Sequence, residues 1–366
     1  MSNFAPMEFN HLNFYVDRVE TWHNWFVKTW GGVSKGLHRD APSPQGLVCL
    51  GGVPLLFSSP GATQNGVGFY LEQHPPGIGD VAFRVSQLDH LVDQVLRAGG
   101  TLLQPVQSDA WGRGRWCQIQ GWGKLRHTLI ESNQAGRWLP GYGETPQPPH
   151  GSGLIEGIDH AVLNVPVGQL QGAITWYIDQ LGFQPRQQFT IDTANSGLRS
   201  QVLAHPGGSA QLPINEPATP NSQVQEFLDW NQGAGVQHVA LHTRDILTTV
   251  QQLRQAGIAF LDVPQTYYDD LVNRQGYQTD PSQDQALAQL QILVDWEAHL
   301  PQARLLQTFT QPFLDIPTVF FELIQRQVVQ VNQAPVKARG FGERNFQALF
   351  EAIEREQAKR GSLTLP

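Results

Sequence analysis

The stretch that decides the fold is Gly157-Ile158-Asp159-His160-Ala161-Val162-Leu163-Asn164-Val165. It matches an earlier stretch of the chain, Glu8-Phe9-Asn10-His11-Leu12-Asn13-Phe14-Tyr15-Val16, and both have a histidine in the fourth position. Short runs rich in Ile, Val and Phe are typical of strands. Each run is followed by an aromatic-rich stretch that we expect to be helical and then by a glycine. This recurrence predicts that the chain contains two copies of one architecture.

A second pair of segments supports the duplication. Gly79–Phe83 aligns with Val236–Leu241, and both segments lead into amphipathic helices that we expect at Leu88–Ala98 and Ile246–Ala256. The two helices end alike, in Leu-Arg-Ala-Gly and in Leu-Arg-Gln-Ala-Gly. A third and weaker pair sets the run ending in Glu131 against the run ending in Glu322. The three pairs of matching segments therefore occur in the same order in both halves.

Each half has the order strand, helix, several strands, and then strand and helix again. We therefore predict an α+β fold of tandem βαβββ repeats that form two open barrels, each with an inner face able to hold a ligand. A stretch dense in Pro and Gly predicts the boundary between the halves. The predicted domains are residues 1–139, which are non-catalytic, a linker at 140–153, and a catalytic barrel at 154–366.

The second half carries a set of residues able to bind a metal ion, namely His160, His238 and Glu322. At the matching positions the first half offers His11, Asp80 and Glu131, for which we expect no catalytic metal. A single histidine in a strand is more often a hydrogen-bonded core residue, but three candidates at repeat-matched positions favour a metal site. Two imidazoles and one carboxylate suit either catalytic zinc or non-haem Fe(II), and the spacing does not separate these. His205 and His242 are possible substitutes without repeat-matched positions.

Composition narrows the class of protein. The chain has 366 residues, 40% of them hydrophobic and 15% charged, as in ordinary globular proteins. Its net charge of −8 argues against partners such as nucleic acids or anionic membranes. We expect no secretory signal, and no run of apolar residues is long enough to span a membrane. Cys49 and Cys117 are the only cysteines, which favours a reducing cytoplasm over a disulfide-rich compartment.

Seven segments of the second half carry a family resemblance. They are Gly157–His160, Ser196–Ser200, Leu212–Pro217, Gly233–His238, Leu306–Thr310, Phe321–Arg326, and Gly340–Gly342 with Asn345–Phe346. Together they cover most of residues 154–361, in order. In these segments the chain resembles the 4-hydroxyphenylpyruvate dioxygenase family of the vicinal-oxygen-chelate superfamily. The first half resembles that family only loosely.

The resemblance implies a cofactor and a set of site residues. Fe(II) would be held by His160, His238 and Glu322. The substrate-binding residues would be Ser200, Pro213, Asn215, Gln223, Gln307, Phe309 and Phe341, and of these Phe309 and Phe341 would sandwich the aromatic ring. Strand alternation agrees, since Pro213 and Asn215 share one face, as do Gln307 and Phe309.

The resemblance also implies an activity, which is the conversion of 4-hydroxyphenylpyruvate and O2 to homogentisate and CO2. The pathway would be tyrosine catabolism or plastoquinone and tocopherol synthesis. The implied partners are these small molecules and other copies of the chain, in a cytoplasmic dimer or tetramer. Two alternatives remain, a 4-hydroxymandelate synthase with the same substrate and metal, and a non-catalytic vicinal-oxygen-chelate binding protein.

The C-terminal segment is predicted to form a gate. A helix over 345–360 would present an apolar stripe of Phe346, Leu349, Phe350 and Ile353 to the barrel, with Asn345 and Phe346 as the gating residues. Gly340 and Gly342 flank Phe341 with flexible backbone. Two positions depart from the family pattern, Arg344 and Ile316, and we expect both to change local surface more than chemistry.

Overall fold

The computed structural model describes residues 6–39, 43–62, 65–109, 112–133, 137–145, 153–193, 196–314 and 316–362. The first half forms a mixed sheet, whose strands are β1 (Met7–Tyr15), β2 (Val33–His38), β3 (Gln45–Leu50), β4 (Val53–Ser58), β5 (Gly77–Val85), β6 (Leu102–Ser108), β7 (Gly114–Gln120) and β8 (Arg126–Ser132). Its helices are α1 (Val19–Thr29), α2 (Gly66–Leu71) and α3 (Leu88–Arg97). A short hairpin, β9 (Arg137–Leu139) and β10 (Gly143–Thr145), follows it.

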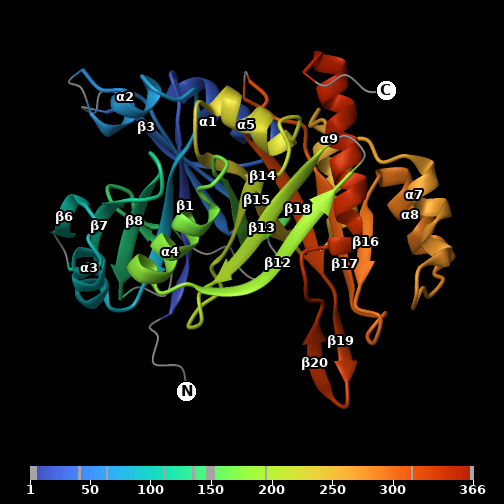
Figure 1. Cartoon of the computed structure of the whole chain (residues 1–366). Helices are drawn as coiled ribbons and strands as arrows, with labels where there is room; N and C mark the ends of the chain where they lie inside the picture. The colour runs from blue at the N-terminus through green and yellow to red at the C-terminus, as the bar shows by residue number, and fades with distance from the viewer. Residues whose placement is uncertain are drawn as a thin grey trace.

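The second half forms an equivalent sheet. Its strands are β11 (Ile155–Asn164), β12 (Gln184–Asp192), β13 (Gly197–Ala204), β14 (Gln211–Pro217), β15 (Gly235–Thr243), β16 (Leu293–Trp296), β17 (Arg304–Phe309) and β18 (Phe320–Arg326). Its helices are α4 (Leu170–Leu181), α5 (Gln223–Asn231), α6 (Ile246–Gln255), α7 (Gln265–Asp269), α8 (Pro281–Leu290) and α9 (Phe346–Arg360). A hairpin of β19 (Val328–Val331) and β20 (Ala334–Lys337) projects from the edge of this half (Figure 1).

The two sheets have the same strand order. In the first sheet it is β2-β3-β4-β1-β5-β8-β7-β6, and in the second it is β12-β13-β14-β11-β15-β18-β17-β16. In both, the first strand of each βαβββ unit pairs with the last strand of its own unit in parallel, and the two first strands pair antiparallel at the centre. The predicted α+β fold of tandem βαβββ repeats is confirmed.

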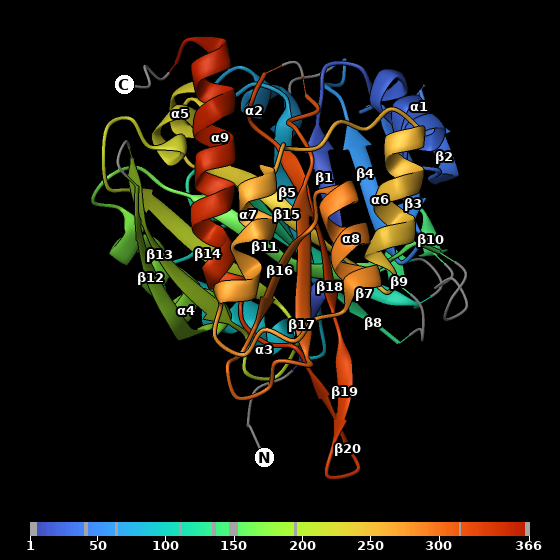
Figure 2. The ribbon, with the colours of Figure 1, turned by 90° about the vertical axis from the view of Figure 1, so that its right-hand side faces the viewer.

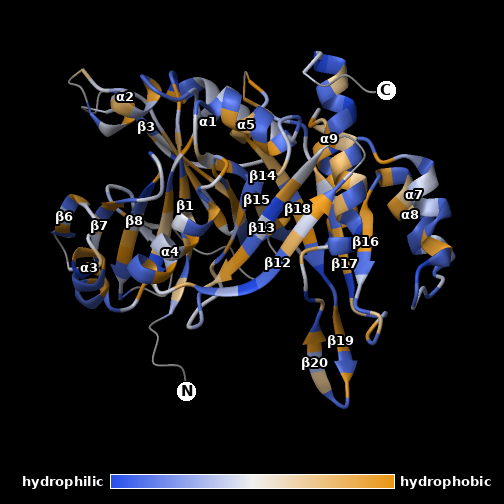
Figure 3. Ribbon diagram, viewed as in Figure 1, coloured by the Kyte–Doolittle hydropathy of each residue, from blue (hydrophilic) through white to orange (hydrophobic). Residues whose placement is uncertain are grey.

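The sheets pack against each other through a shared apolar core. Phe14 of the first sheet lies 6.4 Å from Phe321 of the second, measured between ring centroids, and both side chains are almost fully buried. Phe26 of α1 lies 6.1 Å from the same ring. Burying this much aromatic surface is a large part of what holds the halves together. Figure 3 shows apolar residues concentrated along the strands, with polar and apolar turns alternating along the surrounding helices.

The predicted helices are present with small differences at their ends. The expected helices at Leu88–Ala98 and Ile246–Ala256 are α3 and α6, and each ends one residue earlier than expected. The C-terminal helix α9 begins at Phe346 after a single 3₁₀ turn, Glu343–Asn345. It lies between α5 and α7 on the open side of the second sheet (Figures 1 and 2). Among the described residues no helix is both long and apolar enough to cross a membrane.

Part of the predicted linker lies outside the described residues. Residues 146–152 are in this part, whereas Gly143–Thr145 form the strand β10. The division into residues 1–139, 140–153 and 154–366 therefore stays a prediction, although the two sheets fall on either side of it.

One expected alignment is wrong. The sequence aligns Glu131 with Glu322, but the strand registers give Glu322 a different counterpart. His238 pairs with Phe320 in the second sheet, and its counterpart Asp80 pairs with Arg126 in the first. Two residues further along β18 and β8 stand Glu322 and Thr128. Two glutamates align better in sequence than a glutamate and a threonine, but strand register is set by pairing between strands and not by residue identity.

Candidate metal centre

Three side chains from the central strands of the second sheet converge on one point. They are His160 of β11, His238 of β15 and Glu322 of β18, all buried, and their ligand atoms lie within 4.8 Å of one another. Nε2 of His160 is 3.2 Å from Oε2 of Glu322, and Nε2 of His238 is 3.8 Å from the same oxygen. Metal bonds of about 2.0–2.2 Å would require the ligand atoms to move closer together. The two nitrogens and one carboxylate oxygen fit a divalent cation with further positions left open.

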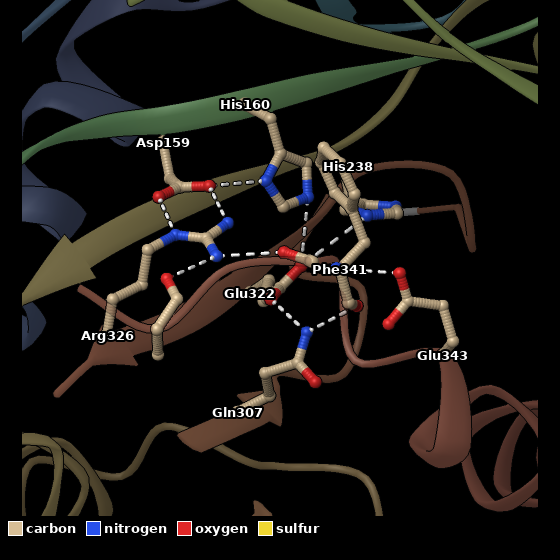
Figure 4. A network of polar contacts seen from close by, with 10 residues as sticks. Asp159, His160, His238, Gln307, Glu322, Arg326, Phe341 and Glu343 are labelled. Atoms are coloured by element: carbon tan, nitrogen blue, oxygen red, sulfur yellow. Dashed lines mark hydrogen bonds and ion pairs between the residues drawn. The ribbon is translucent and has the colours of Figure 1, made fainter. Parts of the chain in front are cut away.

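His160 is oriented by a carboxylate behind it. Its Nδ1 donates to Oδ1 of Asp159 at 2.9 Å, which leaves Nε2 free to face Glu322 (Figure 4). Burial alone would lower the pKa of His160, but the carboxylates of Glu322 and Asp159 raise it to about 9. Without a metal ion the ring therefore holds a proton, which a bound cation would displace.

His238 is oriented by an aromatic ring instead. Its imidazole stacks on Phe320, with 4.8 Å between ring centroids and 19° between planes. Burial and the neighbouring charge of His160 hold the pKa of His238 well below its usual value, so the ring is neutral and able to ligate. Its Nδ1 is buried and makes no hydrogen bond to the residues that the structure describes.

Glu322 is held by a chain of amides that reaches the C-terminal helix. Nε2 of Gln307 donates to Oε1 of Glu322 and to the carbonyl of Phe341, both at 2.9 Å. Nδ2 of Asn345 donates in turn to Oε1 of Gln307, also at 2.9 Å. These contacts use one carboxylate oxygen of Glu322 and leave Oε2 for the two histidines. The segment before α9 is thereby connected to the candidate metal ligand.

Glycine is required in this segment at position 342. Gly342 has a φ of +77°, which side-chain-bearing residues rarely adopt, and a Cβ there would lie 1.8 Å from Oε1 of Gln307. Gly340 also has a positive φ, of +80°. The glycines on either side of Phe341 thus allow the backbone to turn tightly against Gln307.

The three converging residues line a cavity whose space, counted together with its opening to solvent, is about 640 Å³. All seven predicted substrate-binding residues line it, namely Ser200, Pro213, Asn215, Gln223, Gln307, Phe309 and Phe341. Of the two predicted gating residues, Phe346 lines the cavity, whereas Asn345 lies behind it and bonds to Gln307.

Polar groups stand on one wall of this mostly apolar cavity. Ser200 of β13 is opposite Asn215 of β14, whose Nδ2 donates to Oδ1 of Asn164 at 3.3 Å. Gln223 is the first residue of α5, which begins there because the side chain of Ser222 caps it. Oε1 of Gln223 is buried and has no hydrogen-bond partner among the described residues. An unpaired buried acceptor is costly, so this oxygen is suited to a ligand hydroxyl.

Sequence reasoning missed several cavity residues. These are Val162, Phe189, Ile191, Leu198, Val202, Gln237 and Phe320, whereas Leu349, Phe350 and Ile353, which also line the cavity, belong to the predicted apolar stripe. Phe189 of β12 pairs directly with Ser200, so it could have been found once the register was known. Gln237 and His238 both line the cavity because a register shift in the β11–β15 pair interrupts strict alternation.

At the matching position in the first sheet, the carboxylate of Asp80 is occupied by hydrogen bonds from neighbouring residues. Asp80 accepts from the backbone N–H of Thr128 at 2.9 Å, from the Thr128 hydroxyl, and from Nε2 of Gln118 at 2.8 Å. Glu131 lies elsewhere, accepting from the N–H of Leu88 at the start of α3 and pairing with Arg115. Asp80 therefore stands where the second sheet has its second imidazole, that of His238, and its carboxylate is occupied by neutral hydrogen-bond donors.

The two substitute histidines lie away from the cluster. Nδ1 of His242 is 3.2 Å from Oε2 of Glu156, and the ring of His205 packs on Phe183. Neither joins the group of candidate ligands within the described ranges.

Comparisons with known proteins agree with this architecture. The family model of the Glyoxalase/Bleomycin resistance protein/Dioxygenase superfamily matches residues 157–283. A 4-hydroxyphenylpyruvate dioxygenase of Caenorhabditis briggsae is 36% identical, over 97% of this chain and 93% of its own length. One of Yarrowia lipolytica is 34% identical over the same shares of the two chains. A solved structure of a triple mutant of 4-hydroxymandelate synthase from Streptomyces coelicolor superimposes with a TM-score of 0.82, at 26% identity, covering 96% of this chain and 99% of that one.

Proposed function

The chain belongs to the 4-hydroxyphenylpyruvate dioxygenase family, and we propose that it performs that family's reaction on an Fe(II) ion held by His160, His238 and Glu322. The enzyme is an oxidoreductase that converts 4-hydroxyphenylpyruvate and O2 to homogentisate and CO2. The reaction comprises oxidative decarboxylation, ring hydroxylation and migration of the side chain. We also propose that residues 154–366 form the catalytic unit of a cytoplasmic homo-oligomer.

The charge of the cavity carries the metal assignment. The described residues that line it include no lysine or arginine, yet the substrate is a 2-oxo acid with a negative charge. An anion is costly to bury without an opposite charge, and a proton on His160 only balances the carboxylate of Glu322 beside it. A divalent ion bound by the two histidines and Glu322 would provide that charge, and its open positions would accept the substrate and O2.

The other residues would bind and orient the substrate. Phe309 and Phe341 would flank the aromatic ring near the metal ligands, since Phe341 lies 5.2 Å from His160 and Phe309 lies 6.3 Å from His238, between ring centroids. The phenol would point to the polar wall, where Oε1 of Gln223 would accept a hydrogen bond from its hydroxyl. Gln307 would keep Glu322 in position. The apolar face of α9 would keep water out of the reacting region.

A paired substitution tests the metal and the activity together. His238→Ala removes a proposed ligand, and His242→Ala removes a histidine four residues along the same strand that bonds to Glu156 instead. Both proteins are loaded anaerobically with Fe(II), and O2 uptake with 4-hydroxyphenylpyruvate is followed. We expect His238→Ala to lose bound iron and uptake and His242→Ala to retain both. Full activity in His238→Ala would refute the ligand assignment.

A 4-hydroxymandelate synthase is the second candidate, because the structural similarity noted above favours it. It would use the same metal and substrate but hydroxylate the carbon next to the ring. The assignment to homogentisate is preferred because dioxygenases are the relatives that match at higher identity over nearly the whole chain.

A further inference from the structure

A buried arginine stands behind the candidate metal centre. Arg326 of β18 is four residues after Glu322, and its side chain is only 7% exposed. Its Nε donates to Oδ2 of Asp159, and its Nη2 donates to Oδ1, both at 2.7 Å (Figure 4). Two parallel hydrogen bonds between a guanidinium and a carboxylate form the most strongly directional type of ion pair. Asp159 is therefore fixed in one orientation.

Asp159 transmits this constraint to His160. The Oδ1 atom that accepts from Arg326 also accepts from Nδ1 of His160. A carboxylate that bonds to the far nitrogen of a metal-binding histidine sets its tautomer and the direction of its ring. Arg326 thus acts on the candidate ligand through one intervening residue.

The remaining donor of Arg326 reaches the segment that carries Phe341. Its Nη1 donates to the carbonyl of Gly340 at 2.8 Å and more weakly to that of Ala338 at 3.4 Å. The guanidinium carbon also lies 6.0 Å from the centroid of the Phe341 ring, within the range of a cation–π contact. One side chain therefore joins the support of His160 to the loop that places Phe341 against the cavity.

We propose that Arg326 is a positioning residue that aligns metal ligand and substrate ring by fixing Asp159–His160 and the Phe341 loop relative to each other. The inference rests on the proposed function, in which His160 binds Fe(II) and Phe341 contacts the substrate ring.

Comparison of the two halves of the chain supports the proposed role of Arg326. By strand register Ser132 of β8 stands where β18 has Arg326, and Asn10 stands where β11 has Asp159. The first half, which lacks the set of two histidines and a glutamate, therefore also lacks the Asp159–Arg326 ion pair at the matching positions.

The test measures metal binding apart from turnover. Metal-free protein is titrated with Co(II), and the dissociation constant is obtained from calorimetry and from the visible absorption of the bound ion. Arg326→Met removes the guanidinium at similar length, and Asp159→Asn keeps the shape but weakens both contacts. Loss of such a supporting partner typically weakens metal binding 10- to 100-fold. We expect a loss in this range for both variants.

The two variants should differ in their kinetics. Arg326→Met also releases the carbonyl of Gly340, so KM for 4-hydroxyphenylpyruvate should rise and less product should form per O2 consumed. Asp159→Asn leaves Arg326 in contact with the loop, so the change in KM should be smaller. An equal change in KM in both variants would contradict the link to Phe341.

A matched control separates positioning from stability. Arg304 of β17 is also buried, pairs with Asp284, and does not line the cavity. Arg304→Met should lower the melting temperature without changing the affinity for Co(II). If Arg326→Met does not fold because Asp159 is left unpaired, the double variant Asp159→Asn/Arg326→Met removes both charges and should show the same loss of affinity.

The possible failures are distinguishable. Unchanged Co(II) affinity in Arg326→Met or in the double variant would overturn the inference while leaving the proposed function intact. An equal loss in Arg304→Met would show that the effect is merely structural. Failure of the wild-type protein to bind Co(II) would overturn the proposed metal centre, and the inference with it.

Discussion

Asp159 and Asn10 occupy matching places in the two sheets, each with a side-chain oxygen 2.9 Å from Nδ1 of the histidine that follows it. The effect on the two imidazoles is opposite. His160 has a pKa raised to about 9 by its carboxylate neighbours against the effect of burial, whereas burial lowers the pKa of His11 to about 4. The second sheet thus places two carboxylates, Glu322 and Asp159, beside its histidine, as a cation site requires, whereas in the first sheet burial outweighs the one nearby carboxylate, Asp80.

We predict one metal ion per chain. In the first sheet the Asp80 carboxylate is satisfied by Thr128 and Gln118, so Asp80→Asn should leave the iron content of reconstituted protein unchanged. Elemental analysis of wild type and variant checks this. Detection of a second tightly bound ion that disappears in Asp80→Asn would contradict it.

The neutral state of His11 should make stability depend on pH. Its folded pKa of about 4 lies below the value of 6.5 in the unfolded chain, so the unfolded state binds more protons between these values. The contribution of His11 to stability is complete above pH 6.5 and is lost as the pH falls towards 4. At pH 5 the loss is about 2 kcal/mol.

Urea unfolding at pH 7.5 and pH 5 measures this contribution. Other groups also titrate in this range, so the comparison is between wild type and His11→Gln. Between pH 7.5 and pH 5 the free energy of unfolding should fall by about 2 kcal/mol less in the variant than in wild type. An identical loss in both proteins would show that His11 does not contribute.

Gly342→Ala should disturb the amide chain that holds Glu322. The added Cβ would meet Oε1 of Gln307, and the positive φ would be strained. We expect a loss of stability on the order of 1–3 kcal/mol and a fall in kcat of more than tenfold. Steady-state kinetics and thermal unfolding measure both effects, with Gly361→Ala as a control, because that glycine has a similar φ but open space around it. Equal loss of activity in the control would contradict the role of Gln307.

Arg344 is predicted to seat the C-terminal helix. Its Nε donates to Oδ1 of Asp295 at 2.6 Å, and its guanidinium lies over the ring of Trp296 at 4.8 Å. Arg344→Gln weakens this anchor without touching the metal ligands. If α9 is a gate, the ratio of product to O2 consumed should fall while iron content stays unchanged. Unchanged coupling would indicate that the helix is anchored by its apolar face alone.

The fold and the convergence of the ligands could be predicted because matching sequence segments in the two halves indicate that the halves have the same arrangement of strands. The paired runs around His11 and His160 give two equivalent sheets, and equivalent strands bring His160 and His238 together. The amphipathic pattern from Phe346 to Ile353 likewise predicts a helix with one face on the barrel. These are regular features whose period is visible in the sequence.

The rest depended on register and on irregular backbone. The counterpart of Glu322 in the first sheet is Thr128 and not the predicted Glu131, because register is set by pairing between distant strands. Asp159 was missed as a partner of His160 since strict alternation places neighbouring residues on opposite faces, and the register shift between Ile158 and His160 changes this locally. The contact of Asp159 with Arg326 joins strands 167 residues apart and has no local signal.

The identity of the product tests the central claim most directly. Metal-free protein is loaded with Fe(II) without O2, mixed with 4-hydroxyphenylpyruvate, and then exposed to O2, and the products are separated by chromatography. We predict homogentisate as the main product, formed in proportion to the O2 consumed and to the CO2 released. A mixture dominated by 4-hydroxymandelate would contradict the assigned reaction while leaving His160, His238 and Glu322 as metal ligands.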